Sequence, residues 1–320
     1  MKRAGNLYRK ISNRENLELA FYRAQRGKAS RGDVIRFREN LDEELRALSQ
    51  DIEEGTVSVG DYHYFHIHDP KPRTICAACF RERVLHHAIM AVCDGEFERY
   101  QIYDSYASRV GKGVDACLKR TQEFAGKFGW FMKLDIHKFF GSVNHDILLE
   151  LLNRRFKDPE LLYLFSRIVE SYETTPGCGL PIGNLTSQYF ANLYLGLMDH
   201  LIKDTWRIPG YVRYMDDFIL FADSREELIG RLPELTEFLR GELKLELNPL
   251  VLNRCAAGIP YLSYRVYPDR LWLSLKARRR FRRKIRIANE NEDAESALPL
   301  LAFIGRADDR AFRRRVFANP

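Results

Sequence analysis

Hydrophobic and polar residues change their period along the first third of the chain. Apolar residues share one helical face in residues 13–26 and again in residues 33–54. Residues 55–67 alternate with a period of two, which predicts a strand or a hairpin. Residues 81–92 return to the helical period. This part of the chain is therefore expected to be mostly helical, with one short extended segment.

The remaining chain is predicted to mix short strands with longer helices. The expected strands are 129–134, 211–214, 218–222 and short runs between 245 and 273. The expected helices are 112–127, 145–156, 159–171, 185–206, a segment from Ser224 to about 241, and a basic C-terminal region. This order predicts an α+β fold, in which helices cover one face of a small antiparallel sheet.

Basic residues exceed acidic ones and are unevenly distributed. The formal net charge is +7, from 51 Lys and Arg against 44 Asp and Glu. Residues 276–286 read KARRRFRRKIR, and Arg313, Arg314 and Arg315 form a second cluster. A solvated helix face would explain some of this charge. The density favours a polyanion as partner, because each phosphate contact releases condensed counterions.

The cysteines and the apolar segments suggest a reduced, non-membrane protein. Cys76 and Cys79 have half of a zinc-finger spacing, and a second pair at the required distance is missing from the sequence, so buried thiols are favoured over a zinc site. The sequence contains no apolar run of the roughly 18–20 residues that span a bilayer. Its N-terminus lacks the apolar segment of a secretory signal. We therefore expect a cytoplasmic protein.

Two adjacent aspartates separate the apolar strands 211–214 and 218–222. The sequence there is YVRYMDDFILFAD, with Asp216 and Asp217 at the turn. Such a turn can be an ordinary solvated loop. Here the nearly continuous apolar flank favours a buried tip, where neighbouring carboxylates repel one another unless a cation is present. Hard oxygen ligands of this kind suit Mg²⁺.

Asp135 ends the apolar strand 129–134. If this strand lies beside the hairpin, Asp135 approaches Asp216 and Asp217. Three carboxylates could then hold two Mg²⁺ ions about 3.5–4 Å apart, with Mn²⁺ as a possible substitute. In that arrangement one ion activates a primer hydroxyl and the other holds a triphosphate. Phosphoryl transfer needs little more than positioning and neutralisation of charge.

These segments together resemble the motifs of reverse transcriptases, in the same order and over about residues 60–275. The matching segments are Lys71–Ile75 with Arg81–Arg83, Tyr106–Gly113, Asp135–Phe140, Gly179–Gln188, Tyr214–Asp217 and Gly258–Arg265. The resemblance implies a right-hand polymerase fold. Its expected parts are an N-terminal extension with fingers in residues 1–128, a palm in 129–275 and a basic helical thumb in 276–320.

The resemblance also assigns roles to individual residues. The catalytic residues would be Asp135, Asp216 and Asp217, and the metal would be held by these three with Ile136. The residues expected around the incoming dNTP are Lys71, Arg73, Phe140, Ile182, Gly183 and Gln188. Phe140 would exclude a ribose 2′-hydroxyl, while its neighbour Phe139 is a core residue. Arg73, and less surely Lys71, would contact the triphosphate; Lys71 is equally well explained as a solvated charge.

The nucleotide-pocket segment departs from the commonest reverse transcriptase pattern. Most members have Gln-Gly followed by Ser-Pro, whereas this chain has Ile182-Gly183 and Ser187-Gln188. That variant is similar to reverse transcriptases of diversity-generating retroelements. The resemblance implies bacterial or phage origin, adenine-mutagenic copying of a template-repeat RNA, and a small, basic, helical accessory protein that oligomerises. An apolar pocket residue discriminates less than a polar one. Alternatively, Ile182 faces the core.

Other functions stay open on the sequence alone. A retron-type or group II intron-like reverse transcriptase is one. The expected Val-Thr-Gly signature of retrons is missing, and about 45 residues after Lys276 leave little room for a maturase domain. An RNA-binding protein with a degenerate polymerase fold is another, but all three carboxylates are present. The basic helices from Lys276 would hold an RNA–DNA duplex through its backbone.

Overall fold

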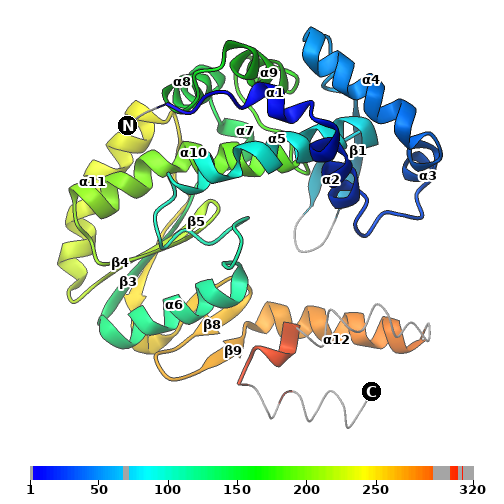
Figure 1. Ribbon diagram of the computed structural model, residues 1–320. Coiled ribbons are helices and arrows are strands. Elements are labelled where there is room, and N and C mark those ends of the chain that lie inside the picture. Colours follow the sequence, from blue (N-terminus) through cyan, green and yellow to red (C-terminus); the bar gives the residue numbers. More distant parts are fainter. Residues whose placement is uncertain (1–2, 68–71, 291–302, 309–311, 313–320) are drawn as a thin grey trace. The chain divides into compact units, whose positions relative to one another are not determined.

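The computed structural model describes residues 3–67, 72–290, 303–308 and 312, which belong to two compact units (Figure 1). The first, here called the helical unit, comprises residues 1–102, 137–199 and 238–246. The second, the sheet unit, comprises residues 103–136, 200–237 and 247–320. The chain passes between them repeatedly. The expected division into fingers, palm and thumb at 128/129 and 275/276 stays a prediction.

The helical unit is built on α5, a long and largely buried helix. Its aromatic core joins Phe97 of α5 with the ring that follows α8 and with rings of α9 and α10, at centroid distances of 5.3–6.4 Å to Phe156, Phe165, Tyr189 and Phe190. The elements assigned to this unit are α1 (Tyr8–Ile11), α2 (Arg14–Ala24), α3 (Gly32–Glu39), α4 (Leu41–Glu54), β1 (Tyr62–Ile67), β2 (Arg73–Ala78), α5 (Phe80–Glu98), α7 (Phe139–Ser142), α8 (His145–Arg155), α9 (Pro159–Glu170), nearly all of α10 (Leu185–His200) and the end of α11 (Arg225–Glu242).

Two expectations for this unit were wrong in detail. The helix predicted over 33–54 is two helices, because Asn40 between them has φ −114° and ψ 30°, outside the helical range. The extended segment predicted over 55–67 starts only at Tyr62 and pairs antiparallel with β2, which the sequence did not predict. The sequence has prolines at positions 70 and 72, and β2 begins directly after the second of them, at Arg73. Its strand character comes from pairing with β1 rather than from its own pattern.

The sheet unit carries two antiparallel sheets. The larger has the strand order β4-β5-β3-β6 and the smaller the order β7-β8-β9. Its elements are α6 (Val114–Lys127), β3 (Trp130–Asp135), the π-helix η1 (Leu201–Thr205), β4 (Gly210–Tyr214), β5 (Asp217–Ala222), most of α11, β6 (Val251–Arg254), the 3₁₀ helix η2 (Cys255–Ala257), β7 (Ile259–Tyr261), β8 (Tyr264–Val266), β9 (Leu271–Leu273) and α12 (Leu275–Glu290). The three strands predicted around the aspartates are confirmed. The helix predicted over 185–206 ends as η1.

One hydrophobic core holds the sheet unit together. Side chains of α6, both sheets and α12 contribute to it. Among the α12 side chains that the structure describes, Ala277, Phe281 and Ile285 are buried at intervals of four positions, and most of the others are basic. The basic cluster 276–286 is therefore an amphipathic helix. The second cluster, Arg313–Arg315, lies outside the described residues.

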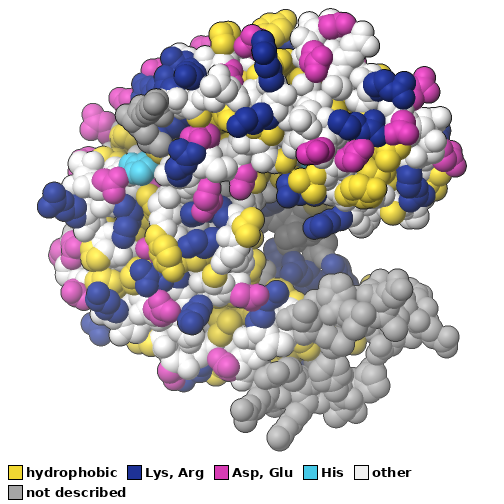
Figure 2. All heavy atoms as spheres, in the orientation of Figure 1, with side chains coloured by type: hydrophobic (Ala, Val, Ile, Leu, Met, Phe, Trp, Pro, Cys, Tyr) yellow, Lys and Arg dark blue, Asp and Glu magenta, His cyan; other side chains and the backbone are white. Residues whose placement is uncertain are grey.

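The structure also bears on the predictions about surface charge, membrane-spanning helices and cysteines. On the face shown in Figure 2, Lys and Arg side chains are mixed with Asp and Glu over both units. No helix of the described chain is long and apolar enough to cross a membrane. All six cysteines are free thiols, and Cys76, one half of the possible zinc motif, is buried.

Candidate active site

The three aspartates lie at one end of the larger sheet. Strands β3 and β5 pair antiparallel, and their register places Asp135 directly opposite Asp217. Asp216 occupies the turn before β5. Directly paired residues of antiparallel strands project from the same face with Cβ atoms about 4.5–5.5 Å apart. The prediction that Asp135 approaches the acidic hairpin is therefore confirmed.

The turn of the β4–β5 hairpin is tight and partly strained. Tyr214 pairs with Asp217, which leaves only Met215 and Asp216 in the loop. Met215 has φ +57°, in the left-handed region that side chains other than glycine rarely adopt. The fully buried Arg213 donates a hydrogen bond from Nη1 to the Met215 carbonyl at 3.1 Å. This contact holds the strained peptide and so fixes the position of Asp216.

Asp217 has the most perturbed carboxyl group of the site. Its side chain is 23% exposed, and Lys133 Nζ lies 2.8 Å from its Oδ1. Burial raises the pKa of Asp217 to about 7, with a further increase from the negative charges of Asp135 and Asp216 and an opposing effect from Lys133. A carboxylate with this environment favours a positive partner.

Asp135 is held by a neutral donor. The side chain of Asn248 donates from Nδ2 to Asp135 Oδ2 at 2.7 Å, and the backbone N–H of Asn248 donates to the Asp135 carbonyl at 2.9 Å. Ile136, the next residue, is buried and donates its amide to the Asp216 carbonyl at 3.2 Å. Tyr261 donates its hydroxyl to the Asp217 carbonyl at 3.0 Å. Contacts from three directions thus fix the backbone on which the carboxylates stand.

The carboxylate oxygens of the three aspartates are chemically suitable ligands for a divalent cation. Carboxylate oxygens from adjacent strand ends are the ligands that Mg²⁺ prefers. As they stand, Asp217 Oδ1 faces Lys133 and Asp135 Oδ2 faces Asn248. Within the described part of the chain, no three His, Cys, Asp or Glu side chains are grouped so that they could share an ion. Asp217 Oδ1 and Asp135 Oδ2 are thus already in contact with other side chains of the sheet unit.

Residues 179–188, the segment predicted to line the nucleotide pocket, lie in the helical unit and are held through backbone hydrogen bonds. Leu180 donates its amide to the Phe140 carbonyl at 2.7 Å, and Cys76 of β2 donates to the Ile182 carbonyl at 2.8 Å. Gly183 has φ +128°, and a Cβ there would lie 3.1 Å from the Cys76 carbonyl oxygen. Only glycine accepts both conditions without strain. The segment is thereby fixed between α7 and β2.

The expected nucleotide-contacting residues are distributed over this unit. Phe139 is buried, as predicted, and Phe140 is partly exposed, with their rings 5.6 Å apart. Ile182 is also partly exposed, so it is not one of the core residues. Arg73 is exposed on β2, and Gln188 lies partly buried on α10. Lys71 falls outside the described residues. Phe140, Ile182 and the strand of Arg73 are brought together by the backbone bonds above.

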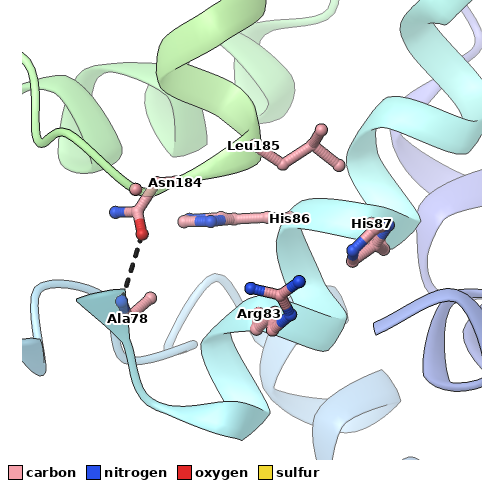
Figure 3. Close-up of a pocket in the computed structure, with 7 residues that line it drawn as sticks. Ala78, Arg83, His86, His87, Asn184 and Leu185 are labelled. Carbon is pink, nitrogen blue, oxygen red and sulfur yellow. Dashed lines mark hydrogen bonds between the residues drawn. The ribbon is translucent and has the colours of Figure 1, made fainter. Parts of the chain in front are cut away.

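A small pocket adjoins the same segment on its α5 side (Figure 3). Its lining residues are Ala78, Arg83, His86, His87, Gly183, Asn184 and Leu185. Asn184 accepts a hydrogen bond from the Ala78 amide at 3.1 Å, which links the pocket segment to the end of β2. Burial, together with the positive charge of Arg83, lowers the pKa of His87 to about 4. His87 is thus neutral near pH 7 and contributes no charge to this wall.

Comparison with known families agrees with this geometry. Residues 68–266 match the model of the reverse transcriptase (RNA-dependent DNA polymerase) family. The chain belongs to the reverse transcriptase family. The matched region includes all three aspartates, the residues expected around the nucleotide and the β4–β5 hairpin, and it lies within the segment whose motifs carried the resemblance.

Individual relatives are distant and longer. The chain is 22% identical over 170 residues to the putative COX1/OXI3 intron 1 protein of Saccharomyces cerevisiae, covering 50% of this chain and 20% of that protein. It is 22% identical over 171 residues to the group II intron-encoded protein LtrA of Lactococcus lactis subsp. cremoris, covering 50% and 28%. The chain therefore matches less than a third of either relative.

A solved structure shows the same fold. Telomerase from Candida tropicalis, truncated from its C-terminal domain, matches with a TM-score of 0.51 at 12% identity, covering 68% of this chain and 56% of that one. The expected α+β polymerase fold is confirmed.

Sequence reasoning missed three residues of the site. Lys133 stands two positions before Asp135, and strand alternation alone places both on one face. This alternation is enough to predict that Lys133 lies near Asp135. Asn248 and Tyr261 gave no such signal, because they reach Asp135 and Asp217 from segments more than forty residues away in sequence.

Proposed function

We propose that this chain is an RNA-directed DNA polymerase that extends a primer on an RNA template with dNTPs. The observation that carries the proposal is the direct pairing of Asp135 with Asp217, with Asp216 in the adjoining turn. Two Mg²⁺ ions held by these carboxylates and the Ile136 backbone would activate the attacking hydroxyl and neutralise the leaving pyrophosphate. Membership of the reverse transcriptase family supports this reaction.

The chain's own residues would position the aspartates and bind the substrates. Asn248 and Arg213 keep Asp135 and the turn in place. The exposed Arg73 would contact the triphosphate as a complementary charge. Phe140 would border the sugar and the base of the nucleotide, together with Ile182 and Gly183, whose segment is hydrogen-bonded to Phe140 and to β2. Gln188 would lie behind these three residues. The basic face of α12 would bind the RNA–DNA duplex through phosphates.

The polymerase proposal is tested with the double variant Asp216→Ala/Asp217→Ala. Incorporation of labelled dNTPs on a primed RNA should fall by at least about a thousandfold, because charge neutralisation is the main catalytic contribution of the protein. Affinity for the RNA, measured by filter binding, should stay within about twofold. Incorporation that survives in the purified variant would overturn the assignment.

We further propose that this polymerase belongs to a diversity-generating retroelement and copies its template-repeat RNA with errors at adenine. The supporting feature is Ile182-Gly183 with Ser187-Gln188, in a segment where Ile182 is partly exposed and Leu180 is hydrogen-bonded to Phe140. An apolar side chain there offers no hydrogen bond with which to select the incoming base. A small basic accessory protein is the partner expected with it.

A defined RNA with a single template adenine tests the subfamily. Ile182→Gln should reduce misincorporation opposite that adenine several-fold, on the order of 1 kcal/mol of discrimination. Ile35→Gln is the matched control, since Ile35 is also a partly exposed isoleucine of the helical unit. Equal adenine error rates for Ile182→Gln and wild type would contradict the pocket explanation.

A group II intron-like reverse transcriptase is the second candidate, favoured by the similarity to LtrA and to the yeast intron protein. It predicts faithful copying opposite adenine by the wild-type chain. The same assay separates the two: a low wild-type error rate at adenine, equal to that at other bases, selects the intron-like function.

A further inference from the structure

Lys133 shares one face of the sheet with the aspartates. Side chains alternate along β3, so Lys133 and Asp135 project together, and the register places Asp217 opposite Asp135 and diagonal to Lys133. Lys133 Nζ reaches across this diagonal to within 2.8 Å of Asp217 Oδ1. The contact follows directly from strand geometry.

This ion pair is partly buried. The Lys133 side chain is 18% exposed and that of Asp217 is 23% exposed. The next residues on the same face, Phe131 and Ile219, are buried in the core of the sheet unit. Among the described residues, Asp217 is the only carboxylate within ion-pair distance of Lys133. Partly buried charges separate at a greater cost than exposed ones, because solvent screens them less.

The two paired aspartates are held by donors of different charge. Asn248 gives Asp135 a neutral hydrogen bond, which leaves the carboxylate charge available. Lys133 instead brings a full positive charge to Asp217. An ammonium and a divalent ion on the same carboxylate oxygen would repel strongly at this distance. A cation that binds Asp217 Oδ1 must therefore displace Lys133.

We propose that Lys133 is a positioning residue that competes with divalent cations for Asp217. It stabilises the β4–β5 hairpin when the ion is absent and lowers the affinity for an ion that arrives without nucleotide. The inference rests on the proposed polymerase function, because it assumes that Asp217 is a metal ligand. It concerns the affinity of the site rather than the identity of its ligands.

The experiment compares wild type with Lys133→Met, which keeps the unbranched shape of the side chain up to the position of Cε and removes the charged ammonium group. Binding of Mn²⁺ to the full chain without nucleotide is measured by electron paramagnetic resonance of the free ion. We expect Lys133→Met to bind Mn²⁺ about tenfold more tightly, corresponding to about 1.4 kcal/mol for a partly buried pair. Its thermal unfolding midpoint in EDTA should be lower than that of wild type.

Two control variants separate this effect from loss of surface charge. Lys119→Met removes an exposed lysine of α6 and should leave Mn²⁺ affinity unchanged. Lys133→Arg keeps the charge and should stay within about twofold of wild type. A purely structural role for Lys133 would lower the unfolding midpoint without tightening Mn²⁺ binding.

Measurable Mn²⁺ binding that is equal or weaker in Lys133→Met than in wild type would overturn the inference while leaving the polymerase proposal intact. Absence of Mn²⁺ binding in both wild type and Lys133→Met would instead contradict the metal site on which the polymerase proposal depends. The two failures are thus distinguishable in one titration.

Discussion

The acidic hairpin of the sheet unit and the nucleotide-pocket segment of the helical unit are both tight chain reversals with a residue at positive φ. They differ in what holds them. The hairpin is closed by strands that are neighbours in sequence, and its turn residue Met215 accepts a hydrogen bond from Arg213, two residues earlier. The segment of Ile182 and Gly183 is tied to β2, about a hundred residues earlier.

The chemical contrast between these regions is equally clear. The hairpin concentrates carboxylates, and the pKa of Asp217 there is raised mainly by burial, against an opposing effect from Lys133. The Ile182 segment contributes a partly exposed apolar side chain and backbone groups. One region is suited to binding cations and the other to shaping a pocket. Substitutions in the first should therefore abolish reaction, whereas those in the second should alter selectivity.

The largest effect is expected for Asp135→Asn. The amide keeps the shape and the contact with Asn248 but removes one of the charges opposite Asp217. Primer extension on RNA should fall by about a thousandfold, while RNA binding stays near wild type. Retention of more than a tenth of the activity would show that Asp135 is not a catalytic ligand.

A smaller and different effect is expected for Phe140→Ala. This ring is partly exposed beside the tethered segment, whereas Phe139 is buried. Loss of the ring should reduce preference for dNTPs over NTPs by about 10- to 100-fold with a modest change in dNTP incorporation. Single-nucleotide incorporation kinetics with matched dNTP and NTP pairs measure the ratio. An unchanged ratio would place the ribose gate elsewhere.

The tether itself is tested by Gly183→Ala. The added Cβ would meet Cys76 O at 3.1 Å at a φ of +128°, so unfolding in urea should lose about 1–3 kcal/mol of stability. Gly95→Ala is the control, since nothing lies within 4 Å of a Cβ there and the position is helical. If both variants are equally stable, the segment is not fixed in the way described.

The smallest effect concerns the dependence of stability on pH in EDTA. The pKa of Asp217 is raised to about 7, so between about pH 4 and 7 the folded chain keeps a proton that the unfolded chain has released. This proton contributes stability at low pH that is lost as pH rises toward 7. Wild type should lose on the order of 1–2 kcal/mol more than Asp217→Asn between pH 5 and 7.5. Parallel urea unfolding curves at the two pH values would contradict the raised pKa.

Much of the fold could be predicted where the determining interactions are local. The strands around Asp135, Asp216 and Asp217 follow from apolar runs of the right length. The helix predicted from Ser224 is confirmed as α11, and the Glu227 amide donates a hydrogen bond to the Ser224 hydroxyl at its start at 3.2 Å. The break at Asn40 and the strand β2 were missed, because one depends on a single residue's backbone angles and the other on its partner strand.

The sequence by itself determined which groups this protein offers: three carboxylates at strand ends, an aromatic pair after Asp135, and an isoleucine where a glutamine is common. Alternation along a strand and the length of a hairpin are properties of neighbouring residues, so pattern is enough to predict them. Tertiary structure decided what surrounds those groups. Lys133 on Asp217 and Asn248 on Asp135 depend on strand register and on segments distant in sequence, which no local pattern encodes.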